Sequence, residues 1–179
     1  MKVLSKYDEK NHTKKIRLKL DDLCNGEYHP FDHPTRYWSV FFPEFESNLD
    51  VVEPPPEREA QYNCYAFALG LNYWVHRIVI FKAIVNEDLD KISVPEKNDI
   101  VVYRSSEFDS SNYLSIRHAG LITLDGKVNS KWAGGAVFKH EVFFSPMSYG
   151  NQVEFYSSVT QNQAGEIMRK YKEFNRQTE

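Results

Sequence analysis

The sequence predicts a single α+β domain in which a short cysteine-bearing helix packs on an antiparallel sheet of about five strands. Three observations predict this fold class. Residues 63–70 form an apolar segment with helix-capping ends, segments rich in β-branched residues follow residue 98, and an amphipathic segment starts at residue 160. The chain has 179 residues, which is enough for one compact domain with a sizeable core.

Residues 63–70 read Asn-Cys-Tyr-Ala-Phe-Ala-Leu-Gly and form the predicted central helix. Asn63 is a favoured N-cap residue, and Gly70 is the residue type that commonly ends a helix in the left-handed conformation. Cys64 then lies in the first turn, where free N–H groups and the helix dipole lower a thiol pKa toward the reactive thiolate. The alternative is an inert buried thiol, since free cysteine is among the most buried residue types.

The predicted sheet lies in the second half of the chain. Its strands are expected over residues 99–103, 114–124, 127–132, 136–144 and 153–157. Asp125-Gly126 is a strong hairpin signal between the second and third of these segments. Residues 71–97 stay ambiguous between a helix and a buried strand, because their apolar pattern fits both periods.

The two ends of the chain carry simpler patterns. Ile16, Leu18 and Leu20 alternate with basic residues, which predicts a half-exposed strand, with a basic patch for a polyanion as the alternative. An aromatic stretch over residues 28–45 is expected to cover the core. Thr160 and Gln163 form a capping-box pattern that predicts a C-terminal helix, to which we assign no chemistry. The apolar face of this helix is expected to comprise Ala164, Ile167, Met168, Tyr171 and Phe174.

We divide the domain into an N-terminal extension over residues 1–56, a core over residues 57–158 and the C-terminal helix over residues 159–179. Composition is that of a soluble globular protein, with 41% hydrophobic and 26% charged residues. The net charge of −3 gives no case for a nucleic-acid or membrane partner. The two cysteines lie in no CxxC motif and the histidines are scattered, so we predict no metal and no cofactor. No apolar leader is present, so a cytoplasmic location is expected, with export by a route that reads no N-terminal signal as the alternative.

His118 is the candidate general base for Cys64. It lies in a predicted strand directly before Ala119 and Gly120, and these small residues leave room for close approach. A histidine within hydrogen-bond reach of a cysteine at a helix N-terminus gives the thiolate–imidazolium pair of cysteine acyl transfer. The alternative for His118 is an ordinary structural histidine, and His140 is expected to be one as well.

The loop around Asp125-Gly126 decides which residue lies beside His118. With a two-residue loop, Lys131 shares its sheet face one diagonal step away, and would bind a substrate carboxylate or stabilise an oxyanion. With a three-residue loop, Ser130 becomes the diagonal neighbour at roughly 7–8 Å. A serine hydroxyl can accept a hydrogen bond from imidazole and a charged lysine cannot, so Ser130 is the expected orienting residue.

The predicted oxyanion hole lies at the start of the cysteine helix. It would use the backbone N–H of Cys64 and a second donor from Asn63 or Tyr62. Asn63 cannot easily cap the helix and donate fully to a substrate at the same time. Capping is therefore its primary expected role.

The order of these motifs resembles the NlpC and CHAP branch of the papain-like superfamily, in which the sheet follows the cysteine helix directly. More closely, the chain resembles an uncharacterised bacterial family with an Asn-Cys-x-Ala-x-Ala-Leu-Gly helix, His-Ala on a strand, Ser-Lys-x-Gly and a late Tyr-Gly. Here these motifs correspond to residues 63–70, 118–119, 130–132 and 149–150. Two departures are Ala133, where the family pattern has glycine, and Asn-Cys-Tyr in place of the Asp-Cys-Ser usual in the NlpC branch.

The resemblance implies a papain-like, NlpC-type core and a cysteine hydrolase or acyltransferase. Cys64 would attack an amide carbonyl, His118 would accept and return the proton, and water or an amine would release the thioester. The expected partner is a peptide or another amide-containing substrate, with a protein partner as a further option. The alternative is a non-catalytic binding or effector/toxin module that keeps the papain-like fold.

Overall fold

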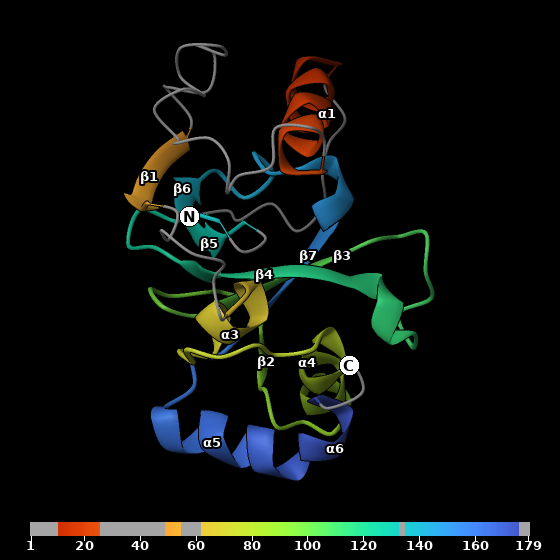
Figure 1. The fold of residues 1–179 in the computed structure, drawn as a ribbon, viewed down its shortest axis with the longest axis vertical. Coiled ribbons are helices and arrows are strands. Elements are labelled where there is room, and N and C mark those ends of the chain that lie inside the picture. The colour runs from red at the N-terminus through yellow and green to blue at the C-terminus, as the bar shows by residue number, and fades with distance from the viewer. Residues whose placement is uncertain (1–10, 26–48, 55–61, 133–134, 176–179) are drawn as a thin grey trace.

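The structure, a computed structural model, describes residues 11–25, 49–54, 62–132 and 135–175. Its centre is a seven-stranded sheet with the strand order β1-β6-β5-β4-β3-β7-β2, in which all neighbours are antiparallel (Figure 1). The five predicted strands are present as β3 (Ile100–Arg104), β4 (Ile116–Ile122), β5 (Val128–Lys131), β6 (Val137–His140) and β7 (Gln152–Tyr156). The sequence did not predict the two edge strands, β1 (Leu49–Glu53) and β2 (Lys91–Ile92).

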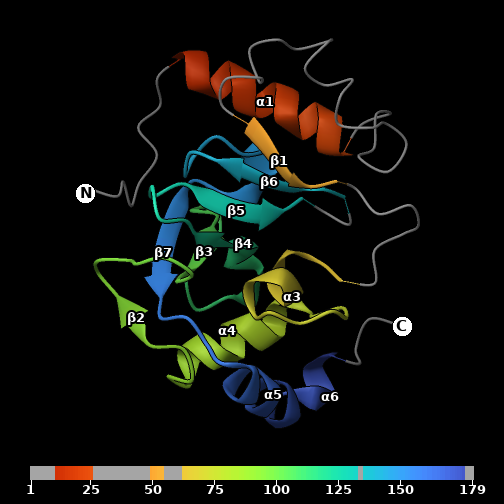
Figure 2. The same ribbon diagram turned by 90° about the vertical axis from the view of Figure 1, so that its left-hand side faces the viewer.

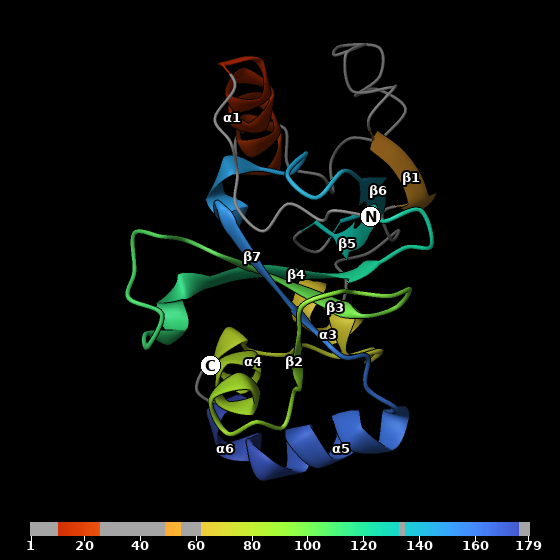
Figure 3. The ribbon, with the colours of Figure 1, turned by 180° about the vertical axis from the view of Figure 1, so that it is seen from behind.

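Helices lie on both sides of this sheet (Figures 1, 2 and 3). On one side is α1 (Asn11–Asn25), together with the short 3-10 turn η3 (Met147–Tyr149). On the other side are α3 (Cys64–Ala68), α4 (Arg77–Val85) and α5 (Gln161–Lys170). These three helices form one hydrophobic core with the face of the sheet that they cover. The shorter elements α6 (Lys172–Asn175) and η2 (Tyr113–Ser115) complete the described elements.

The predicted half-exposed strand near the N-terminus is wrong, because this segment is the helix α1. Ile16, Leu20 and Cys24 are buried at intervals of four residues, which is the spacing of one helical face. Leu18 lies on the other side of the helix and is 46% exposed. The short alternation of apolar and basic residues fits a strand only locally, whereas the interval of four residues runs along the helix.

The predicted cysteine helix is confirmed as α3. Asn63 is its N-cap: Oδ1 accepts a hydrogen bond from the backbone N–H of Ala66 at 3.1 Å. Its Nδ2 donates to the carbonyl of Val75 at 2.8 Å, so both ends of the amide are engaged. Gly70 has φ +66°, the left-handed conformation that glycine adopts at the end of a helix.

The ambiguous segment at residues 71–97 contains α4 and the edge strand β2. The described residues also confirm the C-terminal helix. Thr160 and Gln163 form both hydrogen bonds of the capping box. Of the expected apolar face, Ala164, Ile167 and Tyr171 are buried, and Met168 and Phe174 pack partly buried against the same core.

The hairpin between β4 and β5 has the register of the three-residue loop. Leu121 pairs with Asn129, which places Gly120 opposite Ser130. The N–H of Thr123 donates to the carbonyl of Lys127 at 2.9 Å, and Gly126 has φ +76°. Ser130 is therefore the diagonal neighbour of His118 on one face of the sheet.

In the described part of the chain, no helix combines the length and the apolar character needed to cross a bilayer. The expected aromatic cover over residues 28–45 lies outside the described residues. The division of the chain at residues 56 and 158 stays a prediction.

Candidate functional site

The predicted site residues separate into two groups on opposite faces of the sheet. The side chains on the face of α3 are Tyr62, Asn63, Cys64 and Lys131, and those on the face of α1 are His118 and Ser130. Strand alternation is the cause, since successive side chains in a strand point to opposite faces.

The separation of Cys64 from His118 follows from the direction of Ala119. Ala119 is fully buried in the core that contains Cys64, and its backbone forms a hydrogen bond with the sulfur. The preceding residue, His118, therefore points to the other face. Its ring stacks on Tyr149 with centroids 3.9 Å apart and lies 5.4 Å from the ring of Tyr103. The structure does not bring the predicted nucleophile and the predicted base together.

The Cys64 thiol is held in its neutral form. The residue is 8% exposed. Burial raises the pKa of the thiol to about 12, and hydrogen bonds from the backbone of Ala119, Tyr65 and Cys64 itself offset only part of that effect. The position at a helix N-terminus thus supplies the expected N–H donors, but desolvation outweighs them.

His118 is also neutral. It is 1% exposed, and its Nε2 has no hydrogen-bond partner among the described residues. Burial lowers the pKa of His118 well below its ordinary value, and the nearby His140 lowers it further. A buried imidazole of this kind is poorly placed to hold the proton of an attacking thiol.

Ser130 bonds to His140 and not to His118. Its Oγ lies 2.8 Å from Nε2 of His140, while Nδ1 of His140 lies 2.8 Å from the carbonyl oxygen of Glu141. A carbonyl only accepts, so Nδ1 carries the hydrogen, and the Ser130 hydroxyl donates to Nε2. Trp132 Nε1 donates to the same Oγ at 3.0 Å. His140 is thus a buried structural histidine, as expected, but its pairing with Ser130 depends on the register of β5 against β6, which cannot be read from the sequence.

On the opposite face, Tyr62 and Lys131 contact each other. The Lys131 Nζ lies 4.4 Å from the centroid of the Tyr62 ring and donates to the carbonyl of Gly135 at 2.6 Å. The Tyr62 hydroxyl donates to Glu53 at 3.4 Å. Burial lowers the pKa of Lys131, and Glu53 opposes that shift. This cation lies on the same face as Cys64.

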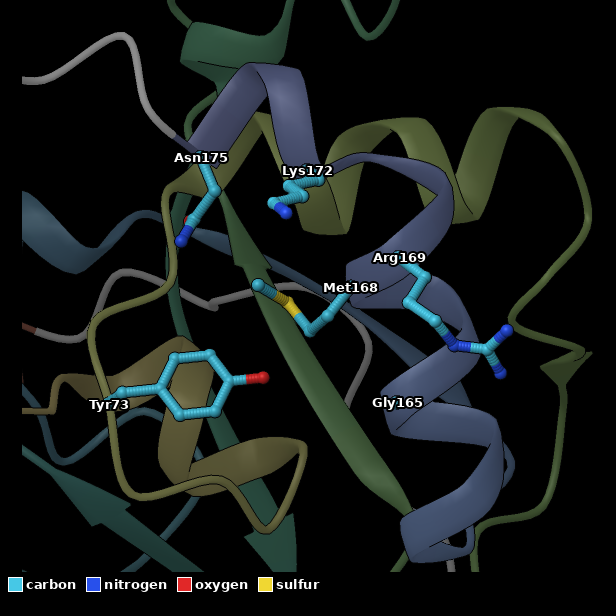
Figure 4. A pocket seen from close by; sticks show the side chains of 6 residues that line it. All are labelled: Tyr73, Gly165, Met168, Arg169, Lys172 and Asn175. Carbon is cyan, nitrogen blue, oxygen red and sulfur yellow. The ribbon is translucent and has the colours of Figure 1, made fainter.

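A cavity of about 390 Å³ lies beside α5, in a region to which the sequence assigned no chemistry (Figure 4). We call it the α5–α6 cavity, and it is lined by Tyr73, Gly165, Met168, Arg169, Lys172 and Asn175. The Asn175 side chain connects α6 to the loop after α3 through two hydrogen bonds. Its Oδ1 accepts from the backbone N–H of His76 at 2.7 Å, and its Nδ2 donates to the carbonyl of Trp74 at 3.1 Å. No sequence pattern indicates this cavity, because its lining residues come from two distant segments of the chain.

No family model, curated protein or solved structure matches the chain. Among the residues that the structure describes, no group of three or more His, Cys, Asp or Glu side chains could hold a metal ion.

Proposed function

We propose that the chain is a non-catalytic binding module built on a cysteine-bearing helix and an antiparallel sheet. The observation that carries this proposal is the position of β4 between the Cys64 sulfur and the His118 imidazole. A thiol with a raised pKa stays protonated near neutral pH, and a base on the far side of a strand cannot take its proton directly.

The resemblance to the NlpC and CHAP branch supports this proposal at the level of architecture. A short helix that starts with cysteine packs on an antiparallel sheet, as that resemblance implies. We propose that the chain keeps a papain-like core without turnover. The buried hydrogen bond between Ser130 and His140 then serves stability and not catalysis.

The α5–α6 cavity supports a role in binding. Small-molecule and cofactor sites commonly have volumes of about 300–1,000 Å³ and combine apolar walls with a few polar groups. At about 390 Å³, with a tyrosine, a methionine and two cations in its lining, the cavity has this character. It lies along α5, and Cys64 is not among the residues that line it.

Cysteine-dependent acyl transfer is the second candidate, and one observation favours it. The backbone of Ala119, Tyr65 and Cys64 directs hydrogen bonds at the sulfur, which is the kind of environment that stabilises a thiolate. This candidate requires a rearrangement that exposes the sulfur and brings a base to its side of the sheet. Its substrate would be a peptide or another amide.

Alkylation of Cys64 by iodoacetamide separates the two candidates. The rate is measured from pH 6 to pH 10 in the native protein and in His118→Gln, and each cysteine is quantified separately by peptide mass spectrometry. Cys24, the other buried thiol, reports any global opening of the chain in the same sample. The binding module predicts an apparent pKa of Cys64 above the ordinary value of about 8.5 and no change in His118→Gln.

The opposite result supports the enzyme. An apparent pKa of Cys64 below about 7 that returns to about 8.5 in His118→Gln would demonstrate a thiolate–imidazolium pair. It would overturn the proposed binding module.

A further inference from the structure

We propose that the α5–α6 cavity binds a short acidic peptide segment in which an apolar side chain lies next to a carboxylate. The inference rests on the proposed binding function and names its ligand class. Three features of the lining carry it: an apolar floor, two cations and an uncovered stretch of helix.

The floor of the cavity is made by Tyr73 and Met168. Tyr73 is 43% exposed, and its ring and the Met168 side chain point toward one another (Figure 4). Aromatic rings and a flexible thioether accommodate an aromatic or aliphatic side chain without strict shape demands. These residues therefore suit the apolar part of the ligand.

The charged groups in the lining are both cations. Arg169 and Lys172 line the cavity, and no acidic residue does. Arg169 forms an exposed ion pair with Glu166 at 3.7 Å, and its guanidinium points away from Tyr73 and Met168 (Figure 4), so Lys172 is the main cation for the ligand. No carboxylate pairs with the Lys172 ammonium within the described ranges. Charge complementarity therefore favours a carboxylate as the polar part of the ligand.

Gly165 lies within α5 and faces the same cavity. A Cβ added to it would meet nothing within 4 Å, so the packing of the described residues does not require glycine. Glycine inside a helix costs about 0.5–1 kcal/mol relative to alanine. An uncovered helix backbone at this position lets the main chain of a bound peptide approach closely.

The lining fits a peptide better than a polyanion. Two cations beside an apolar floor can pair with one or two carboxylates, whereas a nucleic acid requires a basic surface that follows many phosphates.

To test this proposal, the methionine methyl groups of the full chain are isotopically labelled and their NMR chemical shifts are followed as a probe is added. The chain has three methionines, and the described ones lie in different regions: Met168 lines the cavity, while Met147 lies in η3 beside α1. Met168→Leu and Met147→Leu assign the two signals. The probes are acetyl-Phe-Glu-Glu-amide, the neutral acetyl-Phe-Gln-Gln-amide and inorganic phosphate.

We expect the acidic peptide to shift the Met168 signal saturably and to leave the Met147 signal unchanged. Binding should weaken about fivefold in Lys172→Gln, which is the size expected for an exposed ion pair, and by less in Arg169→Gln. Lys15→Gln is the matched control, because it removes an exposed cation on α1, at the far end of the molecule (Figure 1). Gly165→Leu should block binding by filling the space along the helix.

Three results would overturn the inference. The first is a Met168 methyl signal that does not shift at millimolar concentrations of the acidic peptide. The second is a neutral peptide that binds as tightly as the acidic one. The third is a Met168 signal that shifts with inorganic phosphate and not with the acidic peptide. None of them alters the alkylation behaviour of Cys64. Failure of the ligand assignment is thus distinguishable from failure of the proposed function.

Discussion

Ser130 donates its hydroxyl hydrogen to Nε2 of His140 across 2.8 Å, although it is also the diagonal neighbour of His118 on the same face of the sheet. Both residues of this pair are fully buried. The pair has the atoms of a serine–histidine dyad, but Trp132 also donates to the serine oxygen. We therefore regard it as a buried hydrogen-bond network that fixes β5 against β6.

Removal of the Ser130 hydroxyl should destabilise the chain. Ser130→Ala leaves Nε2 of His140 without its donor and the indole N–H of Trp132 without its acceptor, and buried polar groups left without partners cost about 1–3 kcal/mol each. We expect a loss of about 2–4 kcal/mol in the free energy of unfolding, measured by urea titration. Ser110→Ala, at an exposed position, should change it by less than about 0.5 kcal/mol. Equal effects of the two substitutions would contradict the network.

Acid should destabilise the chain through its buried histidines. Burial lowers the pKa of His140 to about 4, with Arg17 and Lys127 acting in the same direction, and the pKa of His118 is lowered as well. The unfolded chain takes up a proton near pH 6.5 and the folded chain does not, so the stability from His140 is complete above that pH and falls as the pH decreases toward 4.

We expect His140 to account for about 2.5 kcal/mol of the stability lost between pH 7.5 and pH 4.5. In His140→Gln, the stability lost between pH 7.5 and pH 4.5 should be smaller by about 2.5 kcal/mol, whatever the effect of the substitution on stability at pH 7.5. Urea titrations of both proteins at the two pH values measure the difference. An identical loss in the variant would show that His140 is not the titrating group.

Arg17 should hold α1 to the rest of the chain. Its guanidinium is buried and donates to three carbonyl oxygens: those of Ser145 at 2.9 Å, Pro146 at 3.2 Å and Gly150 at 2.5 Å. Arg17→Met removes these charged donors and should lower the free energy of unfolding by about 3 kcal/mol.

The matched control for Arg17→Met is Lys15→Met, which changes an exposed cation on the same helix. It should alter stability by less than about 0.5 kcal/mol. Urea titration gives both values. A small effect of Arg17→Met would mean that α1 is held by its apolar face alone.

Substitution of alanine for Gly120 and for Gly165 should change the stability of the chain in opposite directions. A Cβ on Gly120 would lie 2.7 Å from the carbonyl oxygen of Asn129 and 2.8 Å from Cβ of Ser130, so β4 and β5 would have to separate. Gly120→Ala should therefore cost about 2–4 kcal/mol. Gly165→Ala meets open space and should stabilise the chain by about 0.5–1 kcal/mol. Thermal melts of the two variants check the signs, and a stabilised Gly120→Ala would contradict the register of this hairpin.

Local signals in the sequence predicted much of the fold. The ends of α3 follow from Asn63 and Gly70, and the start of α5 follows from Thr160 and Gln163, because caps depend on hydrogen bonds and dihedral angles within a few residues. The prediction failed at α1, where a short alternation concealed the helical spacing of Ile16, Leu20 and Cys24. The edge strands β1 and β2 were missed, because one is almost fully exposed and the other has two residues.

The sequence by itself determined the cysteine helix and the five central strands, and it limited the β4–β5 hairpin to two registers, of which the structure shows the one with a three-residue loop. Only the tertiary structure decided which face of β4 meets α3. A shift of one residue in a strand reverses every side chain, so the choice between His118 and Ala119 as the neighbour of Cys64 depends on packing across the whole sheet. The α5–α6 cavity was likewise decided by tertiary structure, because Tyr73 and Met168 come together only when the C-terminal helix packs on the domain.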